Sequence, residues 1–207
     1  MRSALQRVHG LEPVAVDLQP DGKTDPMLFE ELARAHGLPL GRLAARLEAL
    51  QAEYAADLAA LLLEDGACMP KRGVPRLLSA LGRQSGVTLG IVSGNLERTA
   101  RLKLDAAGLG RYFVAGAYGS DARRREDIVG IALRRFEARD CQFAARQVWV
   151  IGDTPDDVAS GRANGTRTLA VATGRHDRET LGRCAADAVL DDLDDTASVV
   201  DILCRSG

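Results

Sequence analysis

The chain has 207 residues, of which 46% are hydrophobic and 27% are charged. This is the composition of an ordinary globular protein, long enough for one domain with an inserted subdomain or for two small domains. The net charge of −2 gives no electrostatic case for nucleic acid or for a membrane surface, so we expect neither as a partner. No apolar stretch is long enough to span a bilayer, and the first ten residues lack the apolar core of a signal peptide.

The cysteines are scattered along the chain without a CxxC pair and without a histidine at metal-ligand spacing. They are Cys68, Cys141, Cys184 and Cys204. This pattern predicts free thiols in a reducing compartment, and therefore a cytoplasmic protein.

The first third of the sequence is predicted to be helical. Residues 26–36 follow Thr24 and Asp25, a pair typical of a helix start. Residues 41–63 carry leucines at helical spacing and predict a second, longer helix. We therefore expect a helical subdomain over residues 1–66.

From residue 67 onward, helical stretches alternate with short β-rich runs that close in Gly, Ser, Asn or Asp. The β-rich runs include "VTLGIVSGN", "YFVAGAYGS", "QVWVIGDTPDD" and "RTLAVATG". This alternation predicts an α/β fold over residues 67–207, with a parallel sheet covered by helices. In such sheets ligands bind at the carboxyl ends of the strands.

One strand end, in "VTLGIVSGN", carries Ser93, Gly94 and Asn95. A hydroxyl and glycine-freed backbone N–H groups at the start of a helix favour phosphate binding. A simple turn with a helix cap is the alternative reading of the same residues.

A second strand end, in "VWVIGDTPDD", carries Asp153 and, one helical turn later, Asp157. Two convergent carboxylates suit Mg²⁺, which prefers a few carboxylates together with waters and a substrate phosphate. The alternative is a helix cap with a favourable dipole interaction. We favour the metal for Asp153 and the N-cap for Asp156.

Taken together, "IVSGN" and "VWVIGDTPDDVASGRANGTRTLAVATG" resemble motifs of the haloacid dehalogenase (HAD) superfamily, in its phosphoglycolate-phosphatase-like branch. The resemblance runs from "MPKRGVPRLLSALG" to "ADAVLDDLDDT". It implies a three-layer Rossmann-like core with a parallel sheet, and an α-helical cap formed by the first third. It also implies a Mg²⁺-dependent phosphatase that acts on a small phosphorylated metabolite through an aspartyl-phosphate intermediate.

The resemblance also implies roles for single residues. Ser93 would hydrogen-bond the phosphoryl oxygen, with Gly94 and Asn95 beside it in the substrate site. Asp153 would bind Mg²⁺, and Asp157 would bind or orient it.

A basic residue is expected in the third motif, where the family most often has lysine. The chain instead offers Arg123, Arg124 and Arg125 in "SDARRREDIVGIAL". We choose Arg125, because the residues after it best match the helix that follows the basic position of the family, and we expect surface charges at the other two. Lys23 would contact a phosphate or carboxylate of the substrate from the cap, and a solvated loop lysine is the alternative reading.

The first motif of the family, an apolar strand followed by D-x-D-G-T, has only a lookalike in "EPVAVDLQPDGKTD". Its aspartates Asp17 and Asp21 are four residues apart instead of two, and Pro20 interrupts the loop. At about 3.3 Å per extended residue, this spacing misplaces one carboxylate by several ångströms. The stretch better matches the G-[RK]-T-D segment that opens the second cap helix, so we expect the nucleophile strand upstream of Met1.

Without that strand, two neighbouring strands of the sheet would have unpaired edges, unless "PVAVDL" fills the gap. We favour the absence of the strand from this chain. A catalytically inactive binding or scaffold module and a phosphomutase remain alternatives to a phosphatase. A dehalogenase needs no Mg²⁺, so the carboxylates of "GDTPDD" disfavour it. The sequence indicates neither the substrate nor the oligomeric state.

Overall fold

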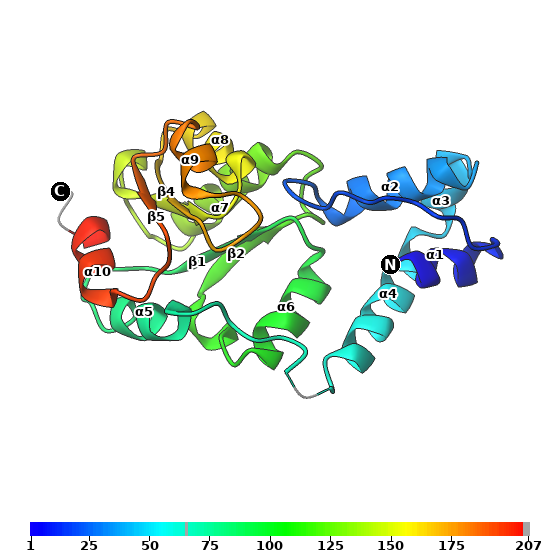
Figure 1. The fold of residues 1–207 in the computed structure, drawn as a ribbon, viewed down its shortest axis with the longest axis horizontal. Coiled ribbons are helices and arrows are strands. Elements are labelled where there is room, and N and C mark those ends of the chain that lie inside the picture. The colour runs from blue at the N-terminus through cyan, green and yellow to red at the C-terminus, as the bar shows by residue number, and fades with distance from the viewer. Residues whose placement is uncertain (65, 205–207) are drawn as a thin grey trace.

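The computed structural model describes residues 1–64 and 66–204. Figure 1 shows a group of helices from the N-terminal third of the chain beside an α/β part formed by the rest. The N-terminal helices are α1 (Arg2–His9), α2 (Asp25–Ala35), α3 (Leu40–Ala45) and α4 (Leu47–Leu61). The division into residues 1–66 and 67–207 stays a prediction, and its residues 65 and 205–207 lie outside the described residues.

The N-terminal helices enclose a hydrophobic core of their own. Leu5, Phe29, Leu32 and Leu50 are fully buried there, and Leu96 from the α/β part packs against them. This shared core joins the two parts of the molecule. None of the helices in the described ranges is both long and apolar enough to cross a membrane.

The long helix predicted over residues 41–63 is in fact two helices. The backbone leaves helical geometry at Arg46, with φ −124° and ψ 20°, and the guanidinium of this residue donates to the carbonyl of Val8. The leucine spacing continues across this break, which is why the sequence pattern did not reveal it. The helix predicted over residues 26–36 corresponds to α2 within one residue at each end.

The α/β part alternates strands with helices. Its strands are β1 (Gly90–Ser93), β2 (Ala115–Tyr118), β3 (Trp149–Gly152), β4 (Arg167–Val171) and β5 (Ala188–Leu190). Its helices are α5 (Val74–Leu81), α6 (Glu97–Ala106), α7 (Arg125–Glu137), α8 (Pro155–Ala163), α9 (Arg178–Gly182) and α10 (Thr196–Cys204).

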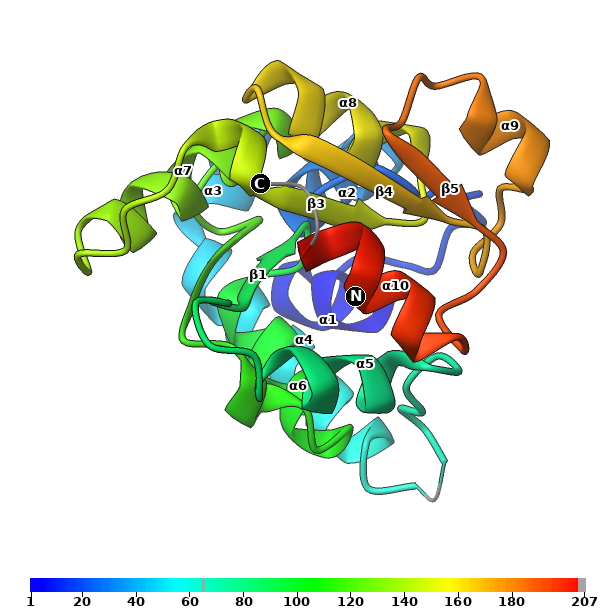
Figure 2. The ribbon, with the colours of Figure 1, turned by 90° about the vertical axis from the view of Figure 1, so that its left-hand side faces the viewer.

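All strand pairs are parallel, β1 with β2, and β4 with both β3 and β5. Helices cover both faces of the larger sheet, as Figure 2 shows. Leu169 and Val171 of β4 pack with α5 and α10, whereas Ala170 packs with α8 and α9. This alternation is the two-residue period of a strand. The predicted parallel α/β fold is confirmed.

The strands form two sheets instead of one. Among the described residues, no ladder of hydrogen bonds joins β1 to β3, although α7 packs on β1 and against α8, which packs on β3. Residues 11–20 contain no strand, so the alternative in which "PVAVDL" fills the gap is wrong. Ile151 of β3 is 40% exposed, which is unusual because parallel strands are normally buried on both faces.

Candidate active site

The carboxyl ends of β1 and β3 are connected by the loop that leads into α2. A Cβ added to Gly94, directly after β1, would lie 2.5 Å from the carbonyl oxygen of Lys23. Gly22, which precedes Lys23 in the loop, packs against the side chain of Asp156 in the loop after β3. The loop therefore touches both strand ends and brings the two predicted groups of site residues into one region.

Ser93 and Gly94 form a tight turn at the end of β1. Oγ of Ser93 accepts a hydrogen bond from the backbone N–H of Asn95 at 3.1 Å, which fixes the oxygen and leaves the hydroxyl proton for another acceptor. Gly94 must be glycine, because its Cβ would collide with the backbone of the loop that leads into α2. The turn thus offers one hydroxyl donor whose oxygen is held in place by the backbone.

The side chain of Asn95 is held inside the protein. Its Nδ2 donates to Oδ1 of Asp25 at 3.1 Å, and its Oδ1 accepts from Nζ of Lys103 at 2.9 Å. The substrate contact predicted for Asn95 gains no support from this amide, which instead links the turn after β1 to α2 and α6.

Of the three candidate arginines, only Arg125 faces the strand ends. Its side chain is 21% exposed, and Nε donates to Oδ1 of Asp157 at 2.9 Å, with Nη2 on the same oxygen. A Cβ on Gly94 would lie 3.1 Å from its Nη1, so the guanidinium spans from β1 to the carboxylate after β3. Arg123 and Arg124 pair with glutamates at the surface, as expected for surface charges.

Asp157 uses both of its carboxylate oxygens within the protein. Oδ1 accepts from Arg125, while Oδ2 accepts from the backbone N–H groups of Asp153 and Thr154, each at 3.1 Å, and from the Thr154 hydroxyl at 2.8 Å. The residue is buried. Of the two roles predicted for Asp157, binding or orienting the metal, this geometry favours orientation.

Thr154 is the N-cap of α8, and its hydroxyl oxygen accepts from the backbone N–H of Asp157 at 3.2 Å. The N-cap predicted for Asp156 is therefore wrong by two residues. Asp156 lies in the first turn, where a carboxylate still interacts favourably with the helix dipole.

The carboxylate of Asp153 has no hydrogen-bond donor among the described side chains. Burial raises the pKa of Asp153, and the neighbouring Asp157 carboxylate raises it further. The backbone N–H of Asp153 and the charges of Lys71 and Arg125 lower this pKa, but by less. Across residues 1–64 and 66–204, no side chain donates a hydrogen bond to this carboxylate or pairs with it. It packs against Gly174 after β4, where a Cβ would collide with it.

Only one of the two predicted metal ligands fits Mg²⁺. Asp153 has a free carboxylate in a negative environment, whereas Asp157 has no free oxygen. The part of the chain that the structure describes contains no group of three or more His, Cys, Asp and Glu side chains arranged around one metal position. A single carboxylate can still hold Mg²⁺ together with waters and a phosphate.

The side chains of the remaining candidates, Lys23, Asp17 and Asp21, are not directed at this arrangement. Nζ of Lys23 pairs with Glu31 at 2.7 Å, so the predicted substrate contact gains no support from the structure. Asp17 is exposed, and Asp21 pairs with Arg175 at 3.3 Å. Neither aspartate follows a strand, which agrees with setting both aside as nucleophiles.

Sequence reasoning missed the positions of Thr24 and Asp25. Both were interpreted only as a helix start, yet their side chains are buried between α2 and the loops of the site. Gly174 was also missed, although its place directly after the strand in "RTLAVATG" was a usable signal.

Comparison with known proteins gives consistent matches. The model of the family described as HAD-hydrolase-like matches residues 126–196. This confirms the resemblance to the HAD superfamily. Pyrophosphatase PpaX from Oceanobacillus iheyensis is 25% identical over 117 residues, which are 55% of this chain and 52% of that protein. The matched segment is thus about half of the length of this curated relative.

Solved structures share the fold of nearly the whole chain. A predicted phosphoglycolate phosphatase from Haemophilus somnus 129PT has a TM-score of 0.68 at 17% identity, covering 96% of this chain and 88% of that one. A Thermotoga maritima protein named as a candidate β-phosphoglucomutase has a TM-score of 0.59 at 17% identity, covering 98% and 89%. At these identities the likeness shows the fold alone.

Proposed function

We propose that this chain forms the phosphate-binding and metal-binding part of a phosphatase that acts on a small phosphorylated metabolite. One observation carries the proposal: the Ser93 hydroxyl follows β1, the free Asp153 carboxylate follows β3, and the Arg125 guanidinium reaches from the turn after β1 to the loop after β3. The matches to a pyrophosphatase and to a predicted phosphoglycolate phosphatase support the same chemistry. The free state of all four cysteines supports a cytoplasmic location.

In this proposal the chain's own groups bind the phosphoryl oxygens. The Ser93 hydroxyl donates to one oxygen, and Nη1 of Arg125, directed toward Gly94, supplies positive charge to another. The bond from Arg125 to Asp157 holds the guanidinium in place before the substrate arrives.

Asp153 would hold Mg²⁺, which would neutralise phosphoryl charge when bound. The support is electrostatic, because a half-buried carboxylate beside the Asp157 charge gains more from a cation than an exposed one does. Asp157 would keep the segment from Asp153 to Thr154 in position through its backbone hydrogen bonds.

We propose that the nucleophilic aspartate stands on a further strand between β1 and β3. Within residues 1–64 and 66–204 no strand pairs with the free edge of β1 or of β3, and Ile151 on β3 is 40% exposed, as expected for a sheet that accepts a strand there. An aspartate at the carboxyl end of such a strand would lie beside Ser93 and Asp153. It would attack the phosphorus and break the P–O bond to the substrate, whose alcohol leaves after taking up a proton, and water would then hydrolyse the aspartyl-phosphate to free phosphate and the original aspartate.

Two other functions remain. A phosphomutase is favoured by the match to the Thermotoga protein. A module that binds phosphoesters without turnover is favoured by the exposed or paired state of Asp17 and Asp21.

Hydrolysis of p-nitrophenyl phosphate, with and without Mg²⁺, tests the proposal on two proteins. One is the 207-residue chain, and the other is the chain extended by the in-frame codons upstream of Met1. We expect Mg²⁺-dependent turnover from the extended protein, lost in Asp153→Asn and retained in Asp105→Asn, an exposed control on α6. Turnover by the 207-residue chain that Asp17→Asn abolishes would refute the added-strand nucleophile, and the absence of turnover from both proteins would favour the binding module.

A further inference from the structure

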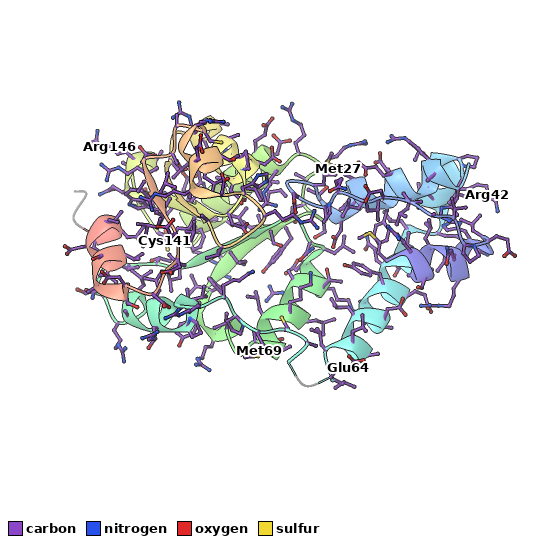
Figure 3. The ribbon with its side chains drawn as sticks, viewed as in Figure 1. Met27, Arg42, Glu64, Met69, Cys141 and Arg146 are labelled. Atoms are coloured by element: carbon purple, nitrogen blue, oxygen red, sulfur yellow. The ribbon has the colours of Figure 1, made fainter. Side chains whose placement is uncertain are left out.

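Thr24 and Asp25, at the start of α2, are polar residues buried where the N-terminal helices meet the α/β part. Thr24 is 0% exposed and Asp25 is 2% exposed. Met27, labelled in Figure 3, marks the end of α2 that faces the α/β part. Although Thr24 is the N-cap residue of α2, its side chain makes no capping hydrogen bond. Burying such groups is unfavourable unless they are bonded elsewhere.

Asp25 caps a different helix, α6, which starts immediately after the turn that carries Ser93. Its carboxylate accepts from the backbone N–H of Leu96 at 2.9 Å, from Nδ2 of Asn95 at 3.1 Å and from the hydroxyl of Thr99 at 3.3 Å. The N-cap residue of α6 is Leu96, which has no side-chain oxygen of its own. The negative charge also lies at the favourable end of the helix dipole.

The backbone of Asp25 also bonds to the turn after β1. The N–H of Asp25 donates to the carbonyl of Gly94 at 2.7 Å. Gly94 also packs against the carbonyl of Lys23. The turn after β1 is therefore contacted by the Asp25 carboxylate, the Asp25 N–H and the Lys23 carbonyl.

Thr24 holds the other side of the site. Its hydroxyl donates to the carbonyl of Arg123 at 3.1 Å, two residues before Arg125. The guanidinium of Arg125 lies beside Gly94, so the two loops held by Thr24 and Asp25 face each other across the proposed phosphate position.

We infer that Thr24 and Asp25 form a positioning element that sets the distance between the Ser93 hydroxyl and the Arg125 guanidinium. Neither residue contacts the phosphate. The inference rests on the proposed function for the identity of the ligand, but the contacts that carry it belong to the ligand-free protein. It assigns to the N-terminal helices a role in building the anion site itself.

Binding of inorganic phosphate, measured by isothermal titration calorimetry, tests this role. We expect Asp25→Asn to weaken phosphate binding by about tenfold or more, because a misplaced donor loses most of its value. Thr24→Val should weaken binding by a smaller factor, and Thr24→Ser, which keeps the hydroxyl, should restore it. Asp187→Asn is the control, since that carboxylate also accepts from a backbone N–H and a hydroxyl, both of Thr168, but outside the site.

The amide hydrogen exchange of the ligand-free proteins provides a second readout. Asp25→Asn should speed amide exchange at Leu96, and Thr24→Val should change the amide exchange rates of residues 123–125. If Asp25→Asn binds phosphate as tightly as the wild type while losing as much stability as Asp187→Asn, the pair is only a structural tie and the inference is wrong. If the wild type binds no phosphate, the proposed function fails, and unchanged exchange at Leu96 in Asp25→Asn would then overturn the inference separately.

Discussion

The two loops of the candidate site are held in opposite ways. The loop after β3 is fixed by its own neighbours, because Asp157 accepts hydrogen bonds from the backbone of Asp153 and Thr154, four and three positions away. The loop after β1 is fixed from a distance, by Asp25, which lies 70 positions before Asn95. The proposed metal side of the site is therefore held by its own segment and by Arg125, whereas the proposed phosphate side also depends on contacts from the N-terminal helices.

The largest test of the locally held loop is Asp157→Ala. It leaves the Arg125 guanidinium without its partner and removes the acceptor of three further hydrogen bonds. We expect the free energy of unfolding, measured by urea denaturation, to fall by about 3–5 kcal/mol, as for a broken buried ion pair.

Asp156→Ala is the matched control, because the residue is adjacent and has the same charge, but it lies in the first turn without capping the helix. We expect a loss of less than about 1 kcal/mol there. Equal losses in the two variants would show that Asp157 does not organise the loop.

Gly94→Ala and Gly174→Ala compare the rigidity of the two sides. At Gly94 the obstacle is the backbone carbonyl of Lys23. Hydrogen bonds hold the backbone on either side of it, from the N–H of Lys23 to Pro20 and from the N–H of Asp25 to Gly94. At Gly174 it is the carboxylate of Asp153, a side chain that can rotate away. We expect Gly94→Ala to cost about 2–3 kcal/mol in urea unfolding and Gly174→Ala clearly less. A larger loss at Gly174 would mean that Asp153 is as fixed as the turn after β1.

This contrast explains which parts of the site the sequence could predict. The contacts within "GDTPDD" join residues three or four positions apart. The spacing of Asp153 and Asp157 therefore predicted that they lie close together, although only the coordinates show that Asp157 has no free oxygen. Arg125 was chosen because the residues after it resemble the helix that follows the basic position of the family, and its guanidinium does lie near Gly94, whereas its role in catalysis stays a prediction. The roles of Thr24 and Asp25 could not be inferred, since a helix-start signal looks the same whether the side chains cap their own helix or another one. The alternation of helical and β-rich stretches predicted the α/β fold, but the leucine spacing did not predict the break between α3 and α4 at Arg46.

Asp121 tests whether charge also stabilises the distant side, at the end of β2. Burial alone would raise the pKa of Asp121, but hydrogen bonds from Arg135 and from the Tyr118 N–H hold it below 3.8. A lowered folded-state pKa contributes stability that is fully present above the ordinary pKa of the group, and this contribution is lost as pH falls from that value through the lowered pKa of the folded state. Asp121→Asn should cost about 1.5 kcal/mol at pH 7, and the difference from wild type should shrink toward pH 3. A difference that is independent of pH would exclude the charge as its source.

The smallest expected effect, and the sharpest test of locality, is Thr154→Ala. The substitution removes the N-cap of α8 and one donor to Asp157, for an expected loss of about 1 kcal/mol. Because the bonds of Thr154 stay within its own loop, amide exchange should change at Asp157 and remain unchanged at Leu96, which Asp25 holds from the other side. Faster exchange at Leu96 would show that the two loops are coupled through Arg125, which contacts both. In that case the metal side would also depend on the N-terminal helices, and a cation bound at Asp153 would change the affinity for phosphate before any chemistry takes place.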